Sequence, residues 1–82
     1  MEPKGIQSVE RTFLIVEELA RNKGGLRLTS LAKKLELPPS TVHRFLNSLM
    51  DLGYVTQDGN TGEYSLGVKF LFLANTVLQQ LQ

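Results

Sequence analysis

Few side chains in this sequence could do covalent or metal chemistry. The chain has no cysteine and a single histidine, His43, which excludes a thiolate nucleophile, a disulfide framework and a multi-histidine metal site. No second histidine or acidic partner stands near His43 in the sequence, so His43 is not a convincing base or ligand. A small hydrolase or metal enzyme would need clustered acids or a histidine pair. We therefore predict no catalytic residue, no metal site and no cofactor.

Residues 39–52 combine small hydroxyl groups with one long cation. At about 100° per residue of a helix, one face carries Ser40, Arg44, Asn47 and Asp51, the opposite face carries Val42, Phe45, Leu46 and Leu49, and the flanks carry Thr41, His43 and Ser48. Hydroxyl groups can contact phosphates, and an arginine can bond both acceptors of a guanine edge. The pattern favours a helix that reads double-stranded DNA in its major groove.

Plainer interpretations of the same residues exist. Arg44 could be a solvated arginine on a helix surface, and Ser40 and Thr41 could serve only to cap the first turn of the helix. Capping and phosphate contact are compatible roles. For His43, a surface imidazole or one that touches a phosphate is the favoured interpretation.

Charge is segregated along the chain, although the net charge is only +1. Residues 21–44 hold six bases and one acid, whereas the segments on either side are each net negative by two. A solvated basic helix face would explain this pattern equally simply. If the segment binds DNA, we expect Arg27, Lys33 and Lys34 to contact the phosphate backbone, which positions a protein without specifying a sequence.

The elements that must position these residues can be predicted from periodicity and turn signals. We expect a first helix over about residues 8–21, with Ser8 as its N-cap and a core stripe of Val9, Phe13, Val16 and Ala20 beside Leu19. Asn22, Lys23 and the paired glycines Gly24 and Gly25 should end it. Residues 26–28 alternate like a very short strand.

Two further helices should follow. One covers about residues 30–36, capped by Thr29 or Ser30, with Leu31, Ala32 and Leu35 inward and Lys33, Lys34 and Glu36 outward. The next covers residues 39–52, with Pro39 in its first turn and Gly53 as its C-terminal cap.

After Gly53 the sequence pattern changes from that of a helix to that of a β-hairpin. Residues 54–57 and 63–66 are predicted strands around a turn at residues 58–62, and residues 67–82 form a last, strongly apolar helix. We therefore predict a mainly α fold with a small β-hairpin, namely a winged helix-turn-helix over residues 1–66 and a linker or dimerisation helix over residues 67–82. The hairpin tip carries an acid and no base, so either Asn60 and Thr61 contact phosphate or the wing only completes the fold.

The last helix is too apolar on all sides to be a free surface helix. A homodimer would cover it, with Phe70, Ala74, Val77 and Leu81 as the stripe, and would place two reading helices about one DNA turn apart. The alternative is that this helix packs on the first helix and covers the core.

The whole chain has the length of one small soluble module. It has no run of 18 or more apolar residues and no signal-peptide pattern at its N-terminus, so we expect a cytoplasmic protein that does not bind membranes.

Four short phrases in order make the chain resemble the N-terminal DNA-binding domain of the IclR (isocitrate lyase regulator) family of bacterial transcriptional regulators. They are GIQSVER from Gly5, LPPSTVHR from Leu37, LGYV from Leu52 and YSLG from Tyr64. The resemblance implies a reading helix with Ser40, Thr41, His43 and Arg44, a backbone contact by Arg11, and dimers or dimers of dimers on palindromic operators. It implies a repressor more often than an activator.

Two departures from the family pattern matter. Family members continue into a C-terminal domain that binds a small-molecule effector, and this sequence ends before it, so we expect one part of a longer regulator. Pro39 stands where a basic residue is common, which should weaken DNA affinity modestly. The rival function from another class is a winged helix that binds a protein through its last helix and hairpin.

Overall fold

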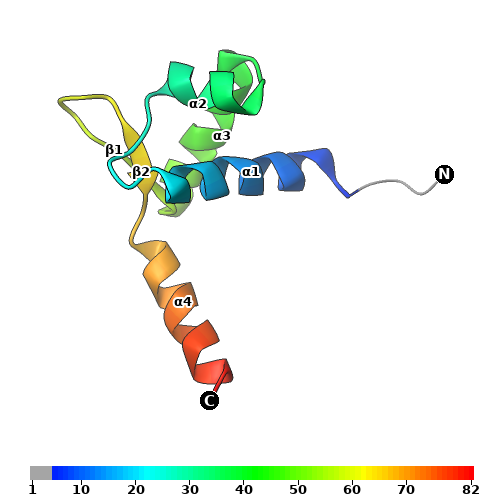
Figure 1. Cartoon of the computed structure of the whole chain (residues 1–82), viewed down its shortest axis with the longest axis vertical. Helices are drawn as coiled ribbons and strands as arrows, with labels where there is room; N and C mark the ends of the chain where they lie inside the picture. The colour runs from blue at the N-terminus through cyan, green and yellow to red at the C-terminus, as the bar shows by residue number, and fades with distance from the viewer. Residues whose placement is uncertain (1–4) are drawn as a thin grey trace.

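The computed structural model describes residues 5–82, which form four helices and a two-stranded antiparallel hairpin (Figure 1). In chain order these are α1 (Gln7–Arg21), α2 (Leu28–Leu35), α3 (Pro39–Leu52), β1 (Val55–Gln57), β2 (Tyr64–Leu66) and α4 (Lys69–Gln80). Val55 lies opposite Leu66 and Gln57 opposite Tyr64 in the ladder. The predicted winged helix-turn-helix with a further C-terminal helix is confirmed. None of the helices within residues 5–82 is long and apolar enough to cross a membrane.

The core lies where α1, α2, α3 and the hairpin meet. Its buried side chains are Ile15, Val16 and Leu19 of α1, Leu31 and Ala32 of α2, Val42, Leu46 and Leu49 of α3, and Val55 and Tyr64 of the hairpin. The hairpin is joined to the connection between α1 and α2 by two backbone hydrogen bonds between Leu26 and Tyr64, of 2.9 and 2.7 Å. The wing is therefore tied to the three helices by both packing and backbone pairing.

The bounds and caps of α3 are as predicted. Pro39 starts the helix, and Gly53 ends it in the left-handed region at φ 88°. The tight turn from α2 into α3 passes through Glu36, which also adopts a left-handed conformation, at φ 56°. The N–H of Leu37 then bonds the carbonyl of Ala32 at 3.0 Å, and this closes the turn that sets the direction of α3.

The predicted caps of α1 and α2 are wrong. Ser8 lies inside α1 behind Ile6, and Thr29 and Ser30 lie inside α2 behind Arg27; neither Ile6 nor Arg27 makes a side-chain capping bond. For α2 the cause is tertiary, because the Leu26–Tyr64 bridge holds the chain extended up to Arg27 and the helix starts directly after it. The predicted strand over residues 26–28 is reduced to that single bridge.

The predicted core stripe of α1 is also wrong in part. Val16 and Leu19 are buried, but Val9 and Phe13 are 50% and 55% exposed and Ala20 is exposed. The most buried residue of the helix is Ile15, because α2 and the hairpin approach α1 from the side that carries Ile15 and Leu19. The helix thus has a second apolar stripe that faces away from the core.

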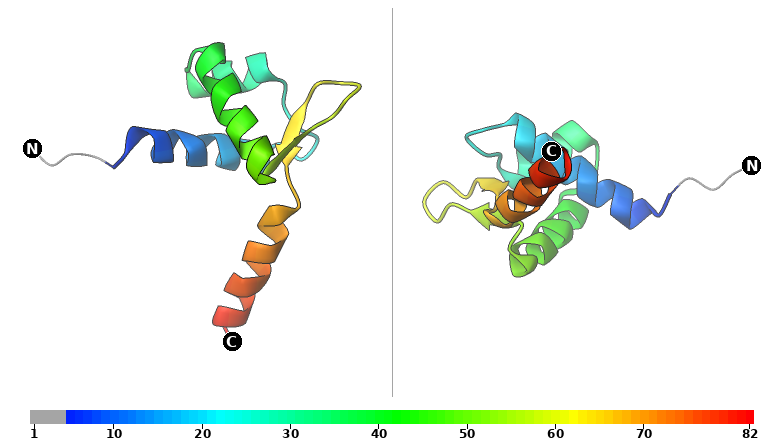
Figure 2. Two further views of the ribbon diagram at one scale, coloured as in Figure 1. Left: turned by 180° about the vertical axis from the view of Figure 1, so that it is seen from behind. Right: turned by 90° about the horizontal axis from the view of Figure 1, so that it is seen from below.

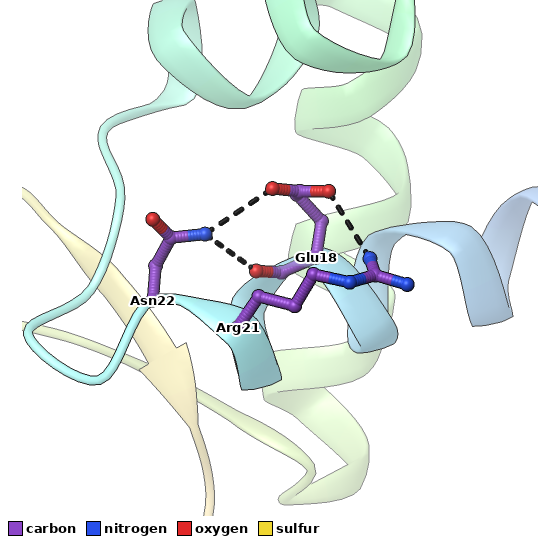
Figure 3. Close-up of polar contacts among 3 residues, drawn as sticks. All are labelled: Glu18, Arg21 and Asn22. Carbon is purple, nitrogen blue, oxygen red and sulfur yellow. Dashed lines mark hydrogen bonds and ion pairs between the residues drawn. The ribbon is translucent and has the colours of Figure 1, made fainter.

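A side chain, and not the paired glycines, ends α1. The Asn22 amide donates to the Glu18 carbonyl oxygen at 2.8 Å and to the Glu18 carboxylate at 3.2 Å, and the same carboxylate pairs with Arg21 at 3.2 Å (Figure 3). Gly25 has a positive φ of 95° in the turn that follows, whereas Gly24 does not. The Arg21 charge is consequently neutralised within its own helix.

The helix α4 stands away from the rest of the fold and has no buried residue (Figures 1 and 2). The alternative in which it packs along α1 and covers the core is wrong. Only its start is anchored, because the N–H of Gly67 bonds the Tyr54 carbonyl at 2.7 Å and the Phe70 ring lies 4.9 Å from the Tyr54 ring. The Lys69 ammonium donates to the Leu52 carbonyl at 3.1 Å, which joins α4 to the end of α3.

Candidate nucleic-acid interface

The solvent-facing side of α3 gathers polar side chains of the kinds that contact nucleic acids. Val42, Leu46 and Leu49 are buried on the opposite side, as the helical period predicts. Five residues form what we call the reading face: Ser40, Thr41, His43, Arg44 and Asn47, of which Thr41 is half-buried and the others exposed. Asp51 is exposed further along the same helix.

The side chains of the reading face are free of internal partners. Within residues 5–82, none of the five makes a side-chain hydrogen bond or an ion pair. An exposed guanidinium such as that of Arg44 therefore keeps all of its donors for a ligand. These side chains therefore make no bond that holds the described fold together, and they are accessible to a ligand.

The amino ends of α2 and α3 also favour anions. Neither helix has a side-chain cap or an acidic residue in its first turn. The unpaired amide groups of a first turn and the helix dipole together attract negative charge. The α3 terminus adjoins the reading face, so both features act on the same side of the molecule.

The cations on and near α2 differ in whether they form an ion pair. Arg27 is exposed at the N-cap of α2, Lys33 and Lys34 are exposed in its last turn, and none of them has an ion partner within residues 5–82. Arg21 is paired with Glu18. Lys33 and Lys34 also suit the negative end of the helix dipole, so part of their role is structural. Arg11 is half-buried on α1 and likewise has no ion partner in the described chain.

The wing tip is organised by one carboxylate. Asp58 accepts backbone N–H bonds from Asn60 at 2.7 Å and from Thr61 at 2.9 Å. The backbone N–H of Thr61, followed by that of Asn60, holds the pKa of the Asp58 carboxyl below its usual value. These amides are consumed inside the turn, and contact of Asn60 or Thr61 with DNA stays a prediction that only their side chains could fulfil.

A cleft of about 310 Å³ separates the amino-terminal half of α1 from α3, and sequence reasoning missed it. It is lined by Ser8, Thr12, Arg44, Phe45, Ser48, Leu49 and Leu52. Ser8 was assigned to a cap and Ser48 to a flank of the reading helix. The sequence did contain a signal for it. Ser8 and Thr12 are spaced so that they lie on the same face of α1 as the buried Ile15 and Leu19.

No group of three or more histidine, cysteine, aspartate or glutamate side chains that could hold a metal ion comes together within residues 5–82.

Comparison with known proteins identifies relatives of this arrangement. The family model for the IclR helix-turn-helix domain matches residues 8–59. The transcriptional repressor IclR of Escherichia coli K12 is 34% identical over 74 residues, which cover 90% of this chain and 27% of that protein. The DNA-binding transcriptional repressor YiaJ of the same strain is 37% identical over 79 residues, covering 96% of this chain and 28% of that protein.

A solved structure extends the comparison to the fold. The crystal structure of an IclR family transcriptional regulator from Brucella abortus matches with a TM-score of 0.87 and 27% sequence identity, over 100% of this chain and 32% of that one. The chain thus spans between a quarter and a third of the length of the relatives it matches.

Proposed function

The chain belongs to the IclR family of helix-turn-helix transcriptional regulators, and we propose that it reads double-stranded DNA by placing α3 in the major groove. Its relatives are DNA-binding regulators of transcription and not enzymes. The observation that carries the proposal is the reading face, whose guanidinium, amide, imidazole and hydroxyl groups are exposed or half-buried and have no internal partners.

The roles of the residues follow from their chemistry and position. Arg44 reads a guanine edge, assisted by Thr41 and His43, because a guanidinium can donate to both acceptors of that base. Ser40 and Asn47 border this contact on the same face. Arg11, Arg27, Lys33 and Lys34 neutralise phosphates, and this gives most of the affinity together with its dependence on salt.

We further propose that the regulator acts as a repressor. The two curated relatives described above carry that word in their names. A protein that occupies the major groove of a promoter competes with other proteins for the same DNA, so tight binding alone suffices for repression.

A homodimer bound to a palindromic operator completes the proposal. Residues 1–66 form the DNA-reading part and residues 67–82 the linker and dimerisation helix, in which Ala74, Val77 and Leu81 are exposed. Phe70 is already half-buried against Tyr54, so it anchors the helix to its own domain and contributes only its remaining surface to a partner. Two copies related by a twofold axis would present two α3 helices to half-sites about one DNA turn apart.

Selection from a random duplex library at low salt, followed by titration of the enriched duplex and a scrambled one at two salt concentrations, tests this function. We expect an enriched palindrome whose advantage over scrambled DNA is reduced in Arg44→Ala. Salt-sensitive binding that enriches no sequence would leave only a basic surface. Absence of such binding at micromolar protein would favour the rival function, a winged helix that docks a protein through α4 and the hairpin.

A further inference from the structure

The core-facing side of α1 changes from apolar to hydroxyl toward its amino end. Ser8, Thr12, Ile15 and Leu19 share one face of the helix, at spacings of four, three and four residues. Ile15 and Leu19 are buried in the core, whereas Ser8 is exposed and Thr12 half-buried. The reason is visible in Figure 2, in which the amino-terminal half of α1 extends past α3 and beyond the core. The hydroxyl groups thus lie along the side of α1 that turns toward α3.

The facing side of α3 carries a matching pair. Arg44 and Ser48 are one helical turn apart and line the cleft together with Ser8 and Thr12. Phe45, Leu49 and Leu52 supply the apolar part of its lining. The cleft therefore has polar groups from both helices and an apolar wall, and Arg44 belongs both to it and to the reading face.

The polar groups of the cleft differ in whether they already make a hydrogen bond within the protein. The Thr12 hydroxyl donates to the Ser8 carbonyl oxygen at 2.7 Å and is occupied within its helix. The side chains of Ser8, Ser48 and Arg44 make no hydrogen bond or ion pair within residues 5–82. Glu10, the nearest acid on α1, is two residues beyond Ser8 and so points about 200° away around the helix. None of the residues that line the cleft is acidic, and Asp51, one turn beyond Ser48 on α3, lies outside that lining. Free donors in a lining without a carboxylate suit an anion.

We propose that the α1–α3 cleft seats one sugar–phosphate unit of the DNA backbone, an assignment that rests on the proposed DNA-reading function. The phosphate accepts hydrogen bonds from the Ser8 and Ser48 hydroxyls and from Arg44 at the rim, and the deoxyribose lies against the apolar wall at Phe45 and Leu52. A guanidinium has five N–H donors, so Arg44 can bond this phosphate with one edge and a base with the other. The contact fixes how far α3 enters the groove.

The test couples a protein change to a change in a single phosphate. The enriched duplex is prepared as a series in which one phosphate at a time is replaced by an uncharged methylphosphonate, and each duplex is titrated with the wild-type chain and with Ser8→Ala/Ser48→Ala. At one backbone position in each half-site, replacement should weaken wild-type binding about tenfold, the size of a lost hydrogen bond to a charged group. The double variant should lose affinity for all unmodified duplexes alike and be less sensitive than the wild-type chain to replacement at that position, because only Arg44 still contacts that phosphate.

Controls separate this inference from the function on which it rests. Thr56→Ala removes an exposed hydroxyl from β1, outside the cleft and outside the dimerisation helix, and should leave the whole series unchanged. Equal sensitivity of the wild-type chain and the double variant at every position would refute the cleft assignment while leaving the DNA-reading function intact. Failure of the wild-type chain to select any sequence would overturn the function itself and the cleft with it.

Discussion

Arg44 and Lys33 are both exposed cations without an ion partner in the described chain, but different helices carry them. In the proposed complex, α3 presents Arg44 to the base edges and α2 presents Lys33 to the backbone, so their removal should have different consequences. We predict that Arg44→Ala costs about 1–3 kcal/mol on the enriched operator and less on scrambled DNA. Titration of both duplexes measures the difference, and an equal loss on every sequence would show that Arg44 does not read a base.

Lys33→Ala is the companion experiment at the phosphate backbone. We predict that it weakens operator and scrambled DNA by the same factor and lowers the slope of log affinity against log salt by about 1, because one fewer counterion is released. The measurement is a titration over several salt concentrations. An unchanged slope would mean that Lys33 serves only the carboxyl end of α2 and makes no phosphate contact.

Glu36 is the one non-glycine residue with positive φ among residues 5–82, at φ 56°. A left-handed conformation is costly for a residue with a Cβ atom, so Glu36→Gly should raise the free energy of unfolding by about 1 kcal/mol. Glu36→Ala removes the same charge and keeps the strain, which makes it the matched control. Denaturant unfolding of both variants decides the point, since equal stability of the two would contradict a backbone origin.

At the scale of elements, the ends of α3 could be predicted and the starts of α1 and α2 could not. Pro39 and Gly53 mark α3 by their own covalent chemistry, which acts in any context. The start of α2 depends on the pairing of Leu26 with Tyr64, a contact between residues far apart in the sequence. Local capping preferences carry no information about such a contact, and they pointed to Thr29 or Ser30 instead.

The same distinction applies to faces and to the site. Helical period alone separates the reading face of α3 from its buried side, and the structure agrees. In α1 it could not choose between two apolar stripes, one through Phe13 and one through Ile15, because neighbouring elements decide which is covered. The α1–α3 cleft was missed for a related reason. Its hydroxyl groups come from two helices whose approach is set by the packing of the whole core.

The wing offers a prediction about pH. Backbone hydrogen bonds lower the pKa of Asp58 in the folded state. The stabilising contribution of its carboxylate is therefore complete above the unfolded pKa of about 4 and is lost as pH falls through the lower folded value. Asp58→Asn removes the titrating group. We predict that the wild-type chain loses stability more steeply than the variant as the pH falls through this acidic range. Thermal unfolding of both chains at a series of pH values measures this difference. Parallel pH profiles would show that the Asp58 carboxylate does not stabilise the turn.

For the molecule as a whole, the exposed apolar surface is concentrated on two helices. On α4 it includes Leu71, Phe72, Leu73, Val77, Leu78 and Leu81, and on α1 Val9, Phe13 and Leu14. Between them lies an apolar groove of about 310 Å³, lined by Thr12, Phe13, Val16, Leu49, Leu52, Tyr54, Phe70 and Leu73. So much uncovered apolar surface is unusual for a small monomer and marks an interaction site. The reading face lies on a different side of α3, so association through α4 leaves it free for DNA.

Val77→Glu tests association through α4 with little risk to the fold, because Val77 is 51% exposed and outside the core. A charge in an apolar interface is unfavourable, so sedimentation should show dimers of the wild-type chain and monomers of the variant. Since a dimer holds its second reading helix at high effective concentration, the variant should lose about a hundredfold or more in affinity for the full palindrome and keep its affinity for one half-site.

Gln79→Glu is the matched control, because it places the same charge on an exposed position of α4 outside the predicted stripe and should remain dimeric. A variant that still sediments as a dimer would place the interface elsewhere, and a wild-type chain that binds palindrome and half-site equally would mean that each copy reads DNA alone.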